Sequence, residues 1–425
     1  MFRFYCMKDD DGKKVDEMRR CFSVFSVLLQ IVMKRVFYIS LFFLCCTVGA
    51  WAQDSLRVRL DSLLASEPLL ETSQVGLMIY DLTADSAVYT YNHRQTMRPA
   101  STMKVVTAVS ALHYLGGNYQ LKTTLSYSGE LKDSTLTGNI YLTGGMDPMF
   151  DHTDLRDFAE RLRWLGVDTL RGSIVTDRSM KDTLHWGEGW CWDDDNPTLS
   201  PLLVNGKANF LERFVVELTE TGIVIDSLTV FEDRPPLDAI PLAVVHHSID
   251  QLLLRMMKES DNLYAECLYY QMAASYGLSP ASAIGARSME KQLINTLGLD
   301  SDRYRLADGS GLSLYNYVSP ELLTALLRYA YQQPGIYAHL LPSLPVAGQD
   351  GTLKKRMKNT PAEGNVRAKT GTLTGIISLA GYLTAAKGHE YCFAVINQGV
   401  MSGKEARNFQ DRLCSLMCGN KGSEE

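Results

Sequence analysis

The sequence predicts an α+β protein of at least two domains, with helices and an antiparallel sheet in one and a β-rich insert as the other. The chain of 425 residues is longer than a domain with a single hydrophobic core usually is. Near its end, residues 365–373, 376–383 and 391–396 have the pattern of an antiparallel meander of three strands. Between residues 121 and 230, short β-rich runs alternate with glycine and aspartate. These observations together predict the fold class.

Apolar spacing gives the individual elements. Helices are expected at 54–64, 99–114, 154–165, 249–257, 263–276 and 403–416. Further strands are expected at 75–80, 87–91, 123–127, 139–142, 172–176, 214–218 and 222–230, the first two as a hairpin. A proline-containing linker at 232–239 ends the β-rich part. We therefore divide the chain into a main domain of residues 53–115 and 243–425 and an inserted domain of residues 116–242.

Composition excludes several functional classes. The apolar fraction of 46% and the charged fraction of 21% are those of a globular protein, and a net charge of −6 without a basic block argues against nucleic acid as a partner. The eight histidines show no metal-ligand spacing, so neither a metal nor a cofactor is expected. The cysteines after residue 52 are scattered and form no C-x-x-C, which indicates buried small apolar residues: Cys191, Cys267, Cys392, Cys414 and Cys418.

The N-terminal region, residues 1–52, carries an export signal. Met-Lys-Arg at 33–35, an apolar run at 36–48 and Ala-Trp-Ala at 50–52 have the order of a secretory signal peptide. We expect translation to start at Met33, cleavage to leave Gln53 as the first residue, and the mature chain to be periplasmic. The alternative is an uncleaved anchor, with the protein in peripheral contact with the membrane.

The first motif with chemical meaning is Ser101-x-x-Lys104, at the start of a predicted helix. Residues three apart share a helix face, so the two side chains are neighbours. A serine hydroxyl needs a base to act as a nucleophile, and a lysine becomes one when its pKa is lowered. Taken alone, the pair also fits a first-turn serine and a solvated surface lysine.

Two further motifs favour the catalytic interpretation. Ser260-Asp261-Asn262 stands between two predicted helices, where it would also fit an ordinary N-cap cluster. Lys369-Thr370-Gly371 lies inside a predicted strand. S-x-x-K, S-D-N and K-T-G in this order are the signature of serine enzymes that act on D-Ala-D-Ala peptides or β-lactams.

The chemistry of acyl transfer explains the remaining positions. Ser260 can relay a proton to the leaving amine, and Asn262 can hold the acyl amide and orient Lys104. Lys369 and Thr370 can bind a terminal carboxylate, and the two lysines are expected to lower each other's pKa. Gly371 lets a substrate strand lie against the sheet edge, and the backbone N–H groups of Thr372 and Ser101 can form an oxyanion hole.

The chain resembles the class C low-molecular-mass penicillin-binding proteins, the D-alanyl-D-alanine carboxypeptidase/endopeptidase family. Besides the three motifs, the similar segments are residues 99–102, 144–148, 189–194, 308–313, 345–353 and 379–382. The resemblance implies a transpeptidase/β-lactamase-like domain, with helices on both faces of an antiparallel sheet plus an all-helical part. It departs at Leu314, where the family often has arginine, and in an insert shorter than that of the longest members.

The resemblance implies a serine DD-peptidase that removes terminal D-Ala or cleaves D-Ala cross-links, with peptidoglycan peptides as substrates and β-lactams as inhibitors. Two alternatives are a non-enzymatic peptidoglycan-binding or regulatory member of the fold and a serine β-lactamase. The predicted catalytic residues are Ser101, Lys104, Ser260 and Asn262, and the predicted substrate-binding residues are Lys369, Thr370, Gly371 and Thr372.

Overall fold

The computed structural model describes residue 33 and residues 56–193, 196–277 and 280–419. The chain divides into two compact units, residues 1–61 and residues 62–425. In the first unit, residues 56–61 are helical. Apart from Met33, the predicted signal region of residues 1–52 lies outside the described residues. Among the helices that are described, none is both long and apolar enough to cross a membrane.

The second unit contains an antiparallel sheet with the strand order β10-β11-β12-β1-β2. Its strands are β1 (Gln74–Asp81), β2 (Ser86–Tyr91), β10 (Arg367–Leu373), β11 (Ile376–Thr384) and β12 (Glu390–Gln398). The β1–β2 hairpin and the three-strand meander were both predicted, and the structure contains both. Strand β10, which carries the K-T-G motif, lies at one edge of the sheet.

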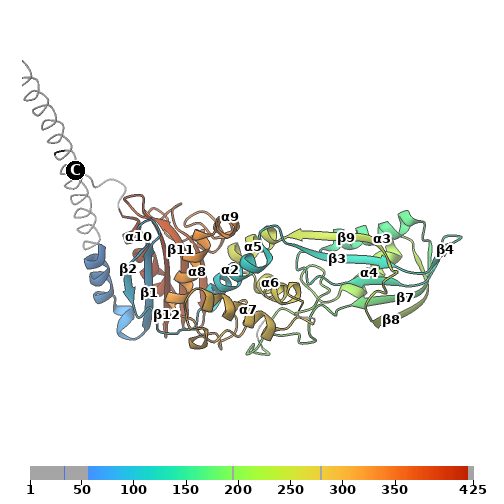
Figure 1. The fold of residues 1–425 in the computed structure, drawn as a ribbon, viewed down its shortest axis with the longest axis horizontal. Helices are drawn as coiled ribbons and strands as arrows, with labels where there is room; N and C mark the ends of the chain where they lie inside the picture. Colours follow the sequence, from blue (N-terminus) through green and yellow to red (C-terminus); the bar gives the residue numbers. More distant parts are fainter. Residues whose placement is uncertain (1–32, 34–55, 194–195, 278–279, 420–425) are drawn as a thin grey trace, which may run out of the picture. The chain divides into compact units, whose positions relative to one another are not determined.

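Helices cover both faces of this sheet, as expected (Figure 1). Helix α8 (Pro320–Gln332) contacts β1, β11 and β12, and Tyr382 of β11 donates a hydrogen bond to the Leu327 carbonyl of this helix. Helix α10 (Gly403–Cys418) contacts β11, and its Gln410 side chain donates to the Ile377 carbonyl. Because neither face meets water, β11 is buried along eight of its nine residues, as is typical of a strand between two layers.

A group of helices packs beside the sheet and shares one hydrophobic core with α8. Its members are α2 (Met103–Leu115), α5 (Ile249–Lys258), α6 (Asn262–Ser275), α7 (Ala283–Thr296) and α9 (Pro334–Ser343). Helix α2 contacts each of the others and is buried continuously from Met103 to Leu112. A helix that is apolar on all sides belongs to the core, so its packing partners determine where its N-terminus lies.

The region between α2 and α5 forms a second, mixed sheet in the order β4-β5-β7-β6-β3-β9, with β8 on the other side of β7. Its strands are β3 (Gln120–Tyr127), β4 (Glu130–Lys132), β5 (Thr135–Thr137), β6 (Ile140–Thr143), β7 (Thr169–Asp177), β8 (Val224–Glu232) and β9 (Ile240–Ser248). Strand β9 pairs with β3 along its length, with Gln120 opposite Ser248.

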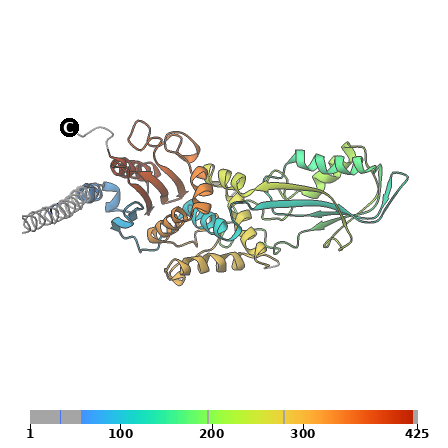
Figure 2. The same cartoon turned by 45° about the horizontal axis from the view of Figure 1, so that its top comes forward.

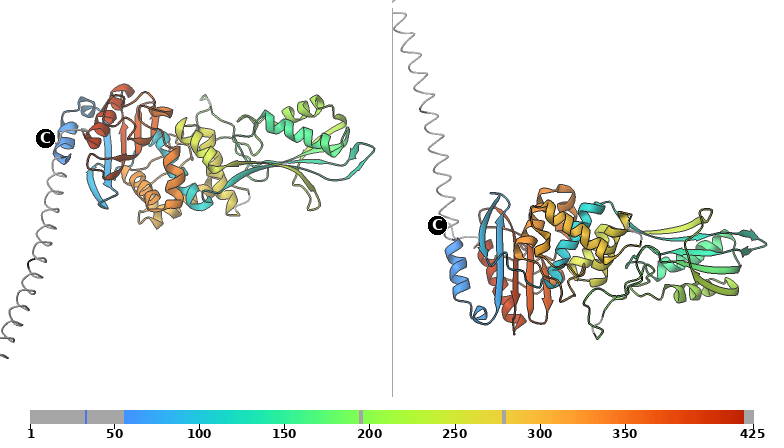
Figure 3. Two further views of the ribbon diagram at one scale, coloured as in Figure 1. Left: turned by 90° about the horizontal axis from the view of Figure 1, so that it is seen from above. Right: turned by 60° about the horizontal axis from the view of Figure 1, so that its bottom comes forward.

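Helices α3 (His152–Leu165) and α4 (Phe210–Glu220) pack on one face of this second sheet (Figures 2 and 3). The predicted strand at residues 214–218 is therefore wrong, since these residues lie inside α4. Phe210, Phe214 and Leu218 are spaced four apart and are fully buried, so the apolar run is one helix face. A five-residue apolar segment is too short to distinguish the helical period of 3.6 residues from the strand period of two.

One cysteine also differs from expectation. Cys267, Cys392, Cys414 and Cys418 are buried, whereas Cys191 is exposed in the loop that precedes α4.

Candidate active site

Ser101 and Lys104 lie at the junction of the first sheet and the helices. Ser101 is in the short 3₁₀ turn η2 (Ala100–Thr102), which continues directly into α2. The Nζ atom of Lys104 lies 3.1 Å from Oγ of Ser101, so the two side chains are neighbours as the spacing predicted. Ala100 has a φ of 49°, a left-handed conformation that costs energy for a residue with a Cβ and is common at functional sites.

The S-D-N motif combines a structural cap with two side chains that face the site. Asp261 caps α6 by accepting hydrogen bonds from the backbone N–H groups of Leu263 and Tyr264. Asn262 instead points its Oδ1 atom at Lys104, 2.7 Å from Nζ. Ser260, with a φ of 63°, forms the tight link between α5 and α6. The cap interpretation therefore holds for Asp261 alone.

The K-T-G strand completes the cluster. Nζ of Lys369 is fully buried and donates to Oγ of Ser260 at 2.8 Å and to the Thr370 carbonyl at 2.7 Å. The hydroxyl of Thr370 points to another threonine, Thr352, at 2.8 Å. Thr372 is exposed, one residue beyond Gly371 on the same strand.

Gly371 has a reason to be glycine besides substrate access. A Cβ atom at this position would lie 2.7 Å from the Pro99 carbonyl oxygen and 3.0 Å from the backbone nitrogen of Ser101. Strand β10 and turn η2 therefore touch at this point, and the neighbouring Ser378 fastens the turn by donating to the same carbonyl at 2.5 Å.

Burial sets the protonation of both lysines. Burial lowers the pKa of Lys104 to about 8, against the opposing charges of Asp308, Glu266 and Asp261. For Lys369, burial lowers the pKa well below its usual value and the charge of Lys104 adds to the effect. The expected mutual depression therefore holds for Lys369, whereas the lowered pKa of Lys104 is due to burial.

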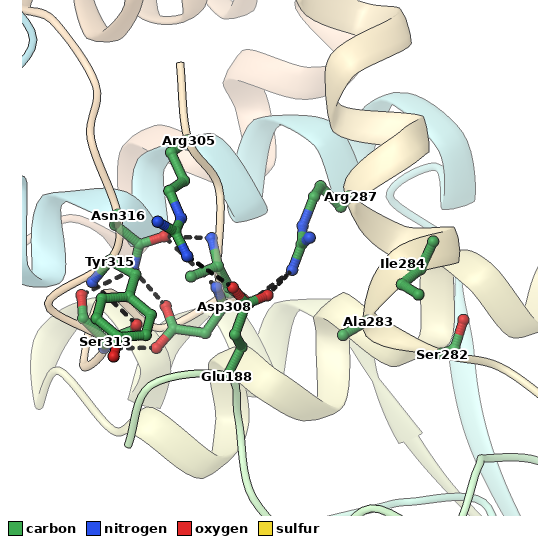
Figure 4. A network of polar contacts seen from close by, with 12 residues as sticks. Glu188, Ser282, Ala283, Ile284, Arg287, Arg305, Asp308, Ser313, Tyr315 and Asn316 are labelled. Atoms are coloured by element: carbon green, nitrogen blue, oxygen red, sulfur yellow. Dashed lines mark hydrogen bonds and ion pairs between the residues drawn. The ribbon is translucent and has the colours of Figure 1, made fainter. Parts of the chain in front are cut away.

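A glycine loop, residues 308–313, contacts the amine of Lys104. The Ser310 carbonyl accepts a hydrogen bond from Nζ of Lys104 at 2.7 Å. Buried Asp308 organises this loop, because its carboxylate accepts from the backbone N–H groups of Gly311 and Ser313, each at 2.7 Å, and from the Asn316 side chain (Figure 4). From the sequence, residues 308–313 were expected to form a tight glycine loop, and no role was assigned to them.

Glu266 fixes the same loop from the other side. Its carboxyl group accepts from the backbone N–H groups of Ser310 at 2.8 Å and Gly309 at 3.3 Å. Burial, with the charge of Asp308, raises the pKa of Glu266 to about 8. Sequence reasoning missed this residue, because a single glutamate on a helix carries no signal until the fold places it under the loop.

The segment around Trp190 reaches the glycine loop from the insert. The indole N–H of Trp190 donates to Asp308 at 2.8 Å, while Glu188 forms ion pairs with Arg287 and Arg305 (Figure 4). Trp186 and Trp192 are exposed by 48% and 81%. Of the three tryptophans, Trp190 is therefore the one that connects the insert to the group holding Lys104.

Within the described residues, no group of three or more His, Cys, Asp or Glu side chains is arranged to hold a metal. Of the two adjacent histidines in β9, His247 contacts the carboxylate of Asp147 at 2.6 Å.

The family model of the D-Ala-D-Ala carboxypeptidase 3 (S13) family matches residues 56–203 and 199–418. The chain belongs to this family. The predicted class of penicillin-binding protein is thereby confirmed, and the chain is a serine peptidase. It is 26% identical over 422 residues to the D-alanyl-D-alanine carboxypeptidase DacB of Haemophilus influenzae, covering 80% of this chain and 88% of that protein. It is 31% identical to carboxypeptidase Rv3627c of Mycobacterium tuberculosis, over 76% of this chain and 75% of the relative.

Solved structures agree on the fold. The crystal structure of penicillin-binding protein 4 (dacB) from H. influenzae superposes with a TM-score of 0.78 at 24% identity, covering 85% of this chain and 99% of that one. A second structure of that protein, complexed with a β-lactam, superposes with a TM-score of 0.71 at 25% identity. The fold prediction of a transpeptidase-like domain is confirmed.

Proposed function

We propose that this chain hydrolyses peptidoglycan stem peptides through a Ser101 acyl-enzyme, both at terminal D-Ala and at D-Ala cross-links. The observation that carries the proposal is the environment of Lys104. A fully buried amine with a pKa near 8 lies 3.1 Å from a serine hydroxyl and is oriented by Asn262 and Ser310. A solvated surface lysine would have none of these properties.

In the proposed mechanism, neutral Lys104 takes the proton of Ser101 as Oγ attacks the carbonyl carbon of the penultimate D-Ala. The backbone N–H groups of Ser101 and Thr372 stabilise the resulting oxyanion. Ser260, which accepts a hydrogen bond from Lys369, passes its proton to the leaving amine as the C–N bond breaks. Ser260 takes in its place the proton that Lys104 received, so Lys104 is neutral again before the second step. Water then attacks the acyl-enzyme, with Lys104 as its base, and releases the shortened peptide and free Ser101.

Substrate recognition in this proposal uses the groups around strand β10. Since Asn262 Oδ1 is bound to Lys104, its amide N–H₂ group is left for the acyl carbonyl of the substrate. Lys369 and Thr370 hold the terminal carboxylate, and the same contacts accommodate the carboxylate of a penicillin. The relatives named D-alanyl-D-alanine carboxypeptidase support this substrate class, as does the β-lactam complex of the H. influenzae protein.

We also propose the predicted division of the chain, with residues 116–242 as an insert that shapes access and supplies no catalytic group. The pairing of β9 with β3 favours extending the insert to Ser248. We further propose that residues 1–52 direct export and that the protein is periplasmic. An uncleaved N-terminal segment would bring it into peripheral contact with the membrane.

The test is product analysis. The purified chain, with and without Ser101→Ala, is incubated with a monomeric peptide ending in D-Ala-D-Ala and with cross-linked muropeptide dimers, and the products are identified by mass spectrometry. We expect release of D-Ala and resolution of dimers by the wild type, and neither by the variant. A folded wild-type chain that leaves both substrates intact would support the non-enzymatic alternative. Rapid multiple-turnover hydrolysis of penicillin would support the β-lactamase alternative.

A further inference from the structure

The hydroxyl of Thr370 has a partner that the three motifs do not include. Oγ1 of Thr370 lies 2.8 Å from Oγ1 of Thr352, which belongs to the short turn η4 (Gly351–Leu353). Thr352 is solvent-exposed, so a substrate can reach it. We propose that Thr352 is a further substrate-binding residue, whose hydroxyl shares the terminal carboxylate of the D-amino acid with Thr370. This inference rests on the proposed function and extends its carboxylate site.

Counting donors supports a two-hydroxyl site. Each threonine hydroxyl has one proton, so whichever of the two donates to the other, the pair keeps one O–H proton to offer outward. In its charged form, which a bound carboxylate favours, Nζ of Lys369 has three protons, of which two are engaged by Ser260 and Thr370 in the contacts described. A carboxylate has two oxygens, and this arrangement can present a hydroxyl to each above a shared cation. When a carboxylate binds, the hydroxyls of Thr352 and Thr370 can therefore replace the hydrogen bond between them with hydrogen bonds to the ligand.

The turn that carries Thr352 is held firmly. Lys258 at the end of α5 forms an ion pair with Asp350 at 2.6 Å, and Asp350 accepts from the Val346 backbone at 2.8 Å. Gly351 has a φ of 50°, and a Cβ there would lie 2.6 Å from the Lys258 carbonyl oxygen. The turn therefore packs against the end of α5, two residues before Ser260. The turn is thereby anchored to the end of α5, and the charge of Lys258 offsets that of Asp350.

The experiment compares substrates with and without the carboxylate. kcat and KM are measured for Thr352→Val and Thr352→Ser on a peptide ending in free D-Ala-D-Ala and on its C-terminal amide. Because a charge-assisted hydrogen bond is lost, we expect Thr352→Val to lower kcat/KM for the free acid about tenfold or more, mainly through KM. The amide should change by less than about threefold, and Thr352→Ser should restore the wild-type value. Thr90→Val, an exposed threonine of β2, is the matched control and should behave as the wild type.

Two results would overturn the inference. Equal losses on the acid and the amide would show that Thr352 only supports the shape of the site, and no loss on either would show that it does not touch the substrate. Acylation of the wild type by penicillin distinguishes these two results from a failure of the proposed function. If the wild type neither reacts with penicillin nor cleaves the peptides, the proposed function itself fails and this inference falls with it. A double variant, Thr352→Val with Thr370→Val, should lose less than the product of the single losses, because the hydroxyls act as one unit.

Discussion

Lys104 has the surroundings of a base because of where α2 lies. Its side chain is fully buried, and its Nζ atom contacts a hydroxyl, an amide oxygen and a carbonyl oxygen. None of these three partners carries a charge, so burial dominates and the neutral amine becomes accessible near neutral pH. The acidic side chains that oppose this effect act from further away, through charge alone.

The lowered pKa of Lys104 predicts the pH dependence of acylation. In the proposed mechanism the neutral form of Lys104 is the base. Because the pKa of Lys104 is about 8, the neutral fraction falls about tenfold for each pH unit below 8. The second-order rate constant for acylation by penicillin should therefore rise with pH through about 8 and then level off. Measurements of the acylation rate constant between pH 6 and 9.5 check this prediction. A rate that is flat, or that falls between pH 6 and 8, would contradict the assignment of Lys104 as the base.

At this scale, the sequence predicted the residues that recur in short motifs and missed those that do not. Ser101, Lys104, Asn262 and Ser260 were found because each stands in a recognisable tripeptide or tetrapeptide, and the structure brings them together. Thr352 acquires its partner from a residue eighteen positions away, which no local pattern can indicate.

At the scale of elements, the site depends on the contact between strand β10 and turn η2. Turn η2 carries Ser101, and the strand reaches it where Gly371 has no side chain. The strands of the meander were predictable from the sequence, but this crossing was not, because it joins residues about 270 positions apart that only the folded chain brings together.

Gly371→Ala tests this contact. The added methyl group would lie 2.1 Å from Oγ of Ser378, 2.7 Å from the Pro99 carbonyl oxygen and 3.0 Å from the Ser101 nitrogen, so the Ser378 side chain and the turn must move. Because Ser101 lies on this turn, its displacement predicts a loss of about tenfold or more in the acylation rate constant. Gly335→Ala in α9 is the control, because nothing lies within 4 Å of its added methyl group. If Gly371→Ala acylates as fast as Gly335→Ala while both fold, the close approach has no catalytic importance.

At the scale of the molecule, the insert and the helices are joined behind the active site. Trp190 of the insert donates to Asp308, Asp308 organises the glycine loop, and the loop's Ser310 carbonyl holds Lys104. The sequence predicted an insert and the order of the motifs around it. It could not predict that one of three neighbouring tryptophans turns inward, because all three occur in the same aromatic and acidic run.

Trp190→Phe tests whether the insert influences Lys104. The variant keeps the aromatic ring but removes the N–H donor to a buried carboxylate, which costs about 1 to 3 kcal/mol of stability. We expect a lower melting temperature and an acylation rate several-fold below that of the wild type. Trp192→Phe, at an 81% exposed position, is the matched control and should change neither. Identical acylation rates for the two variants would mean that the insert does not act on Lys104.

The site of covalent modification by penicillin identifies the nucleophile. The purified chain is incubated with benzylpenicillin, digested with a protease, and each peptide is analysed by tandem mass spectrometry. We expect a single penicilloyl adduct on Ser101, absent from a folded Ser101→Ala variant. An adduct on another residue, or an undiminished adduct in the variant, would show that Ser101 is not the nucleophile.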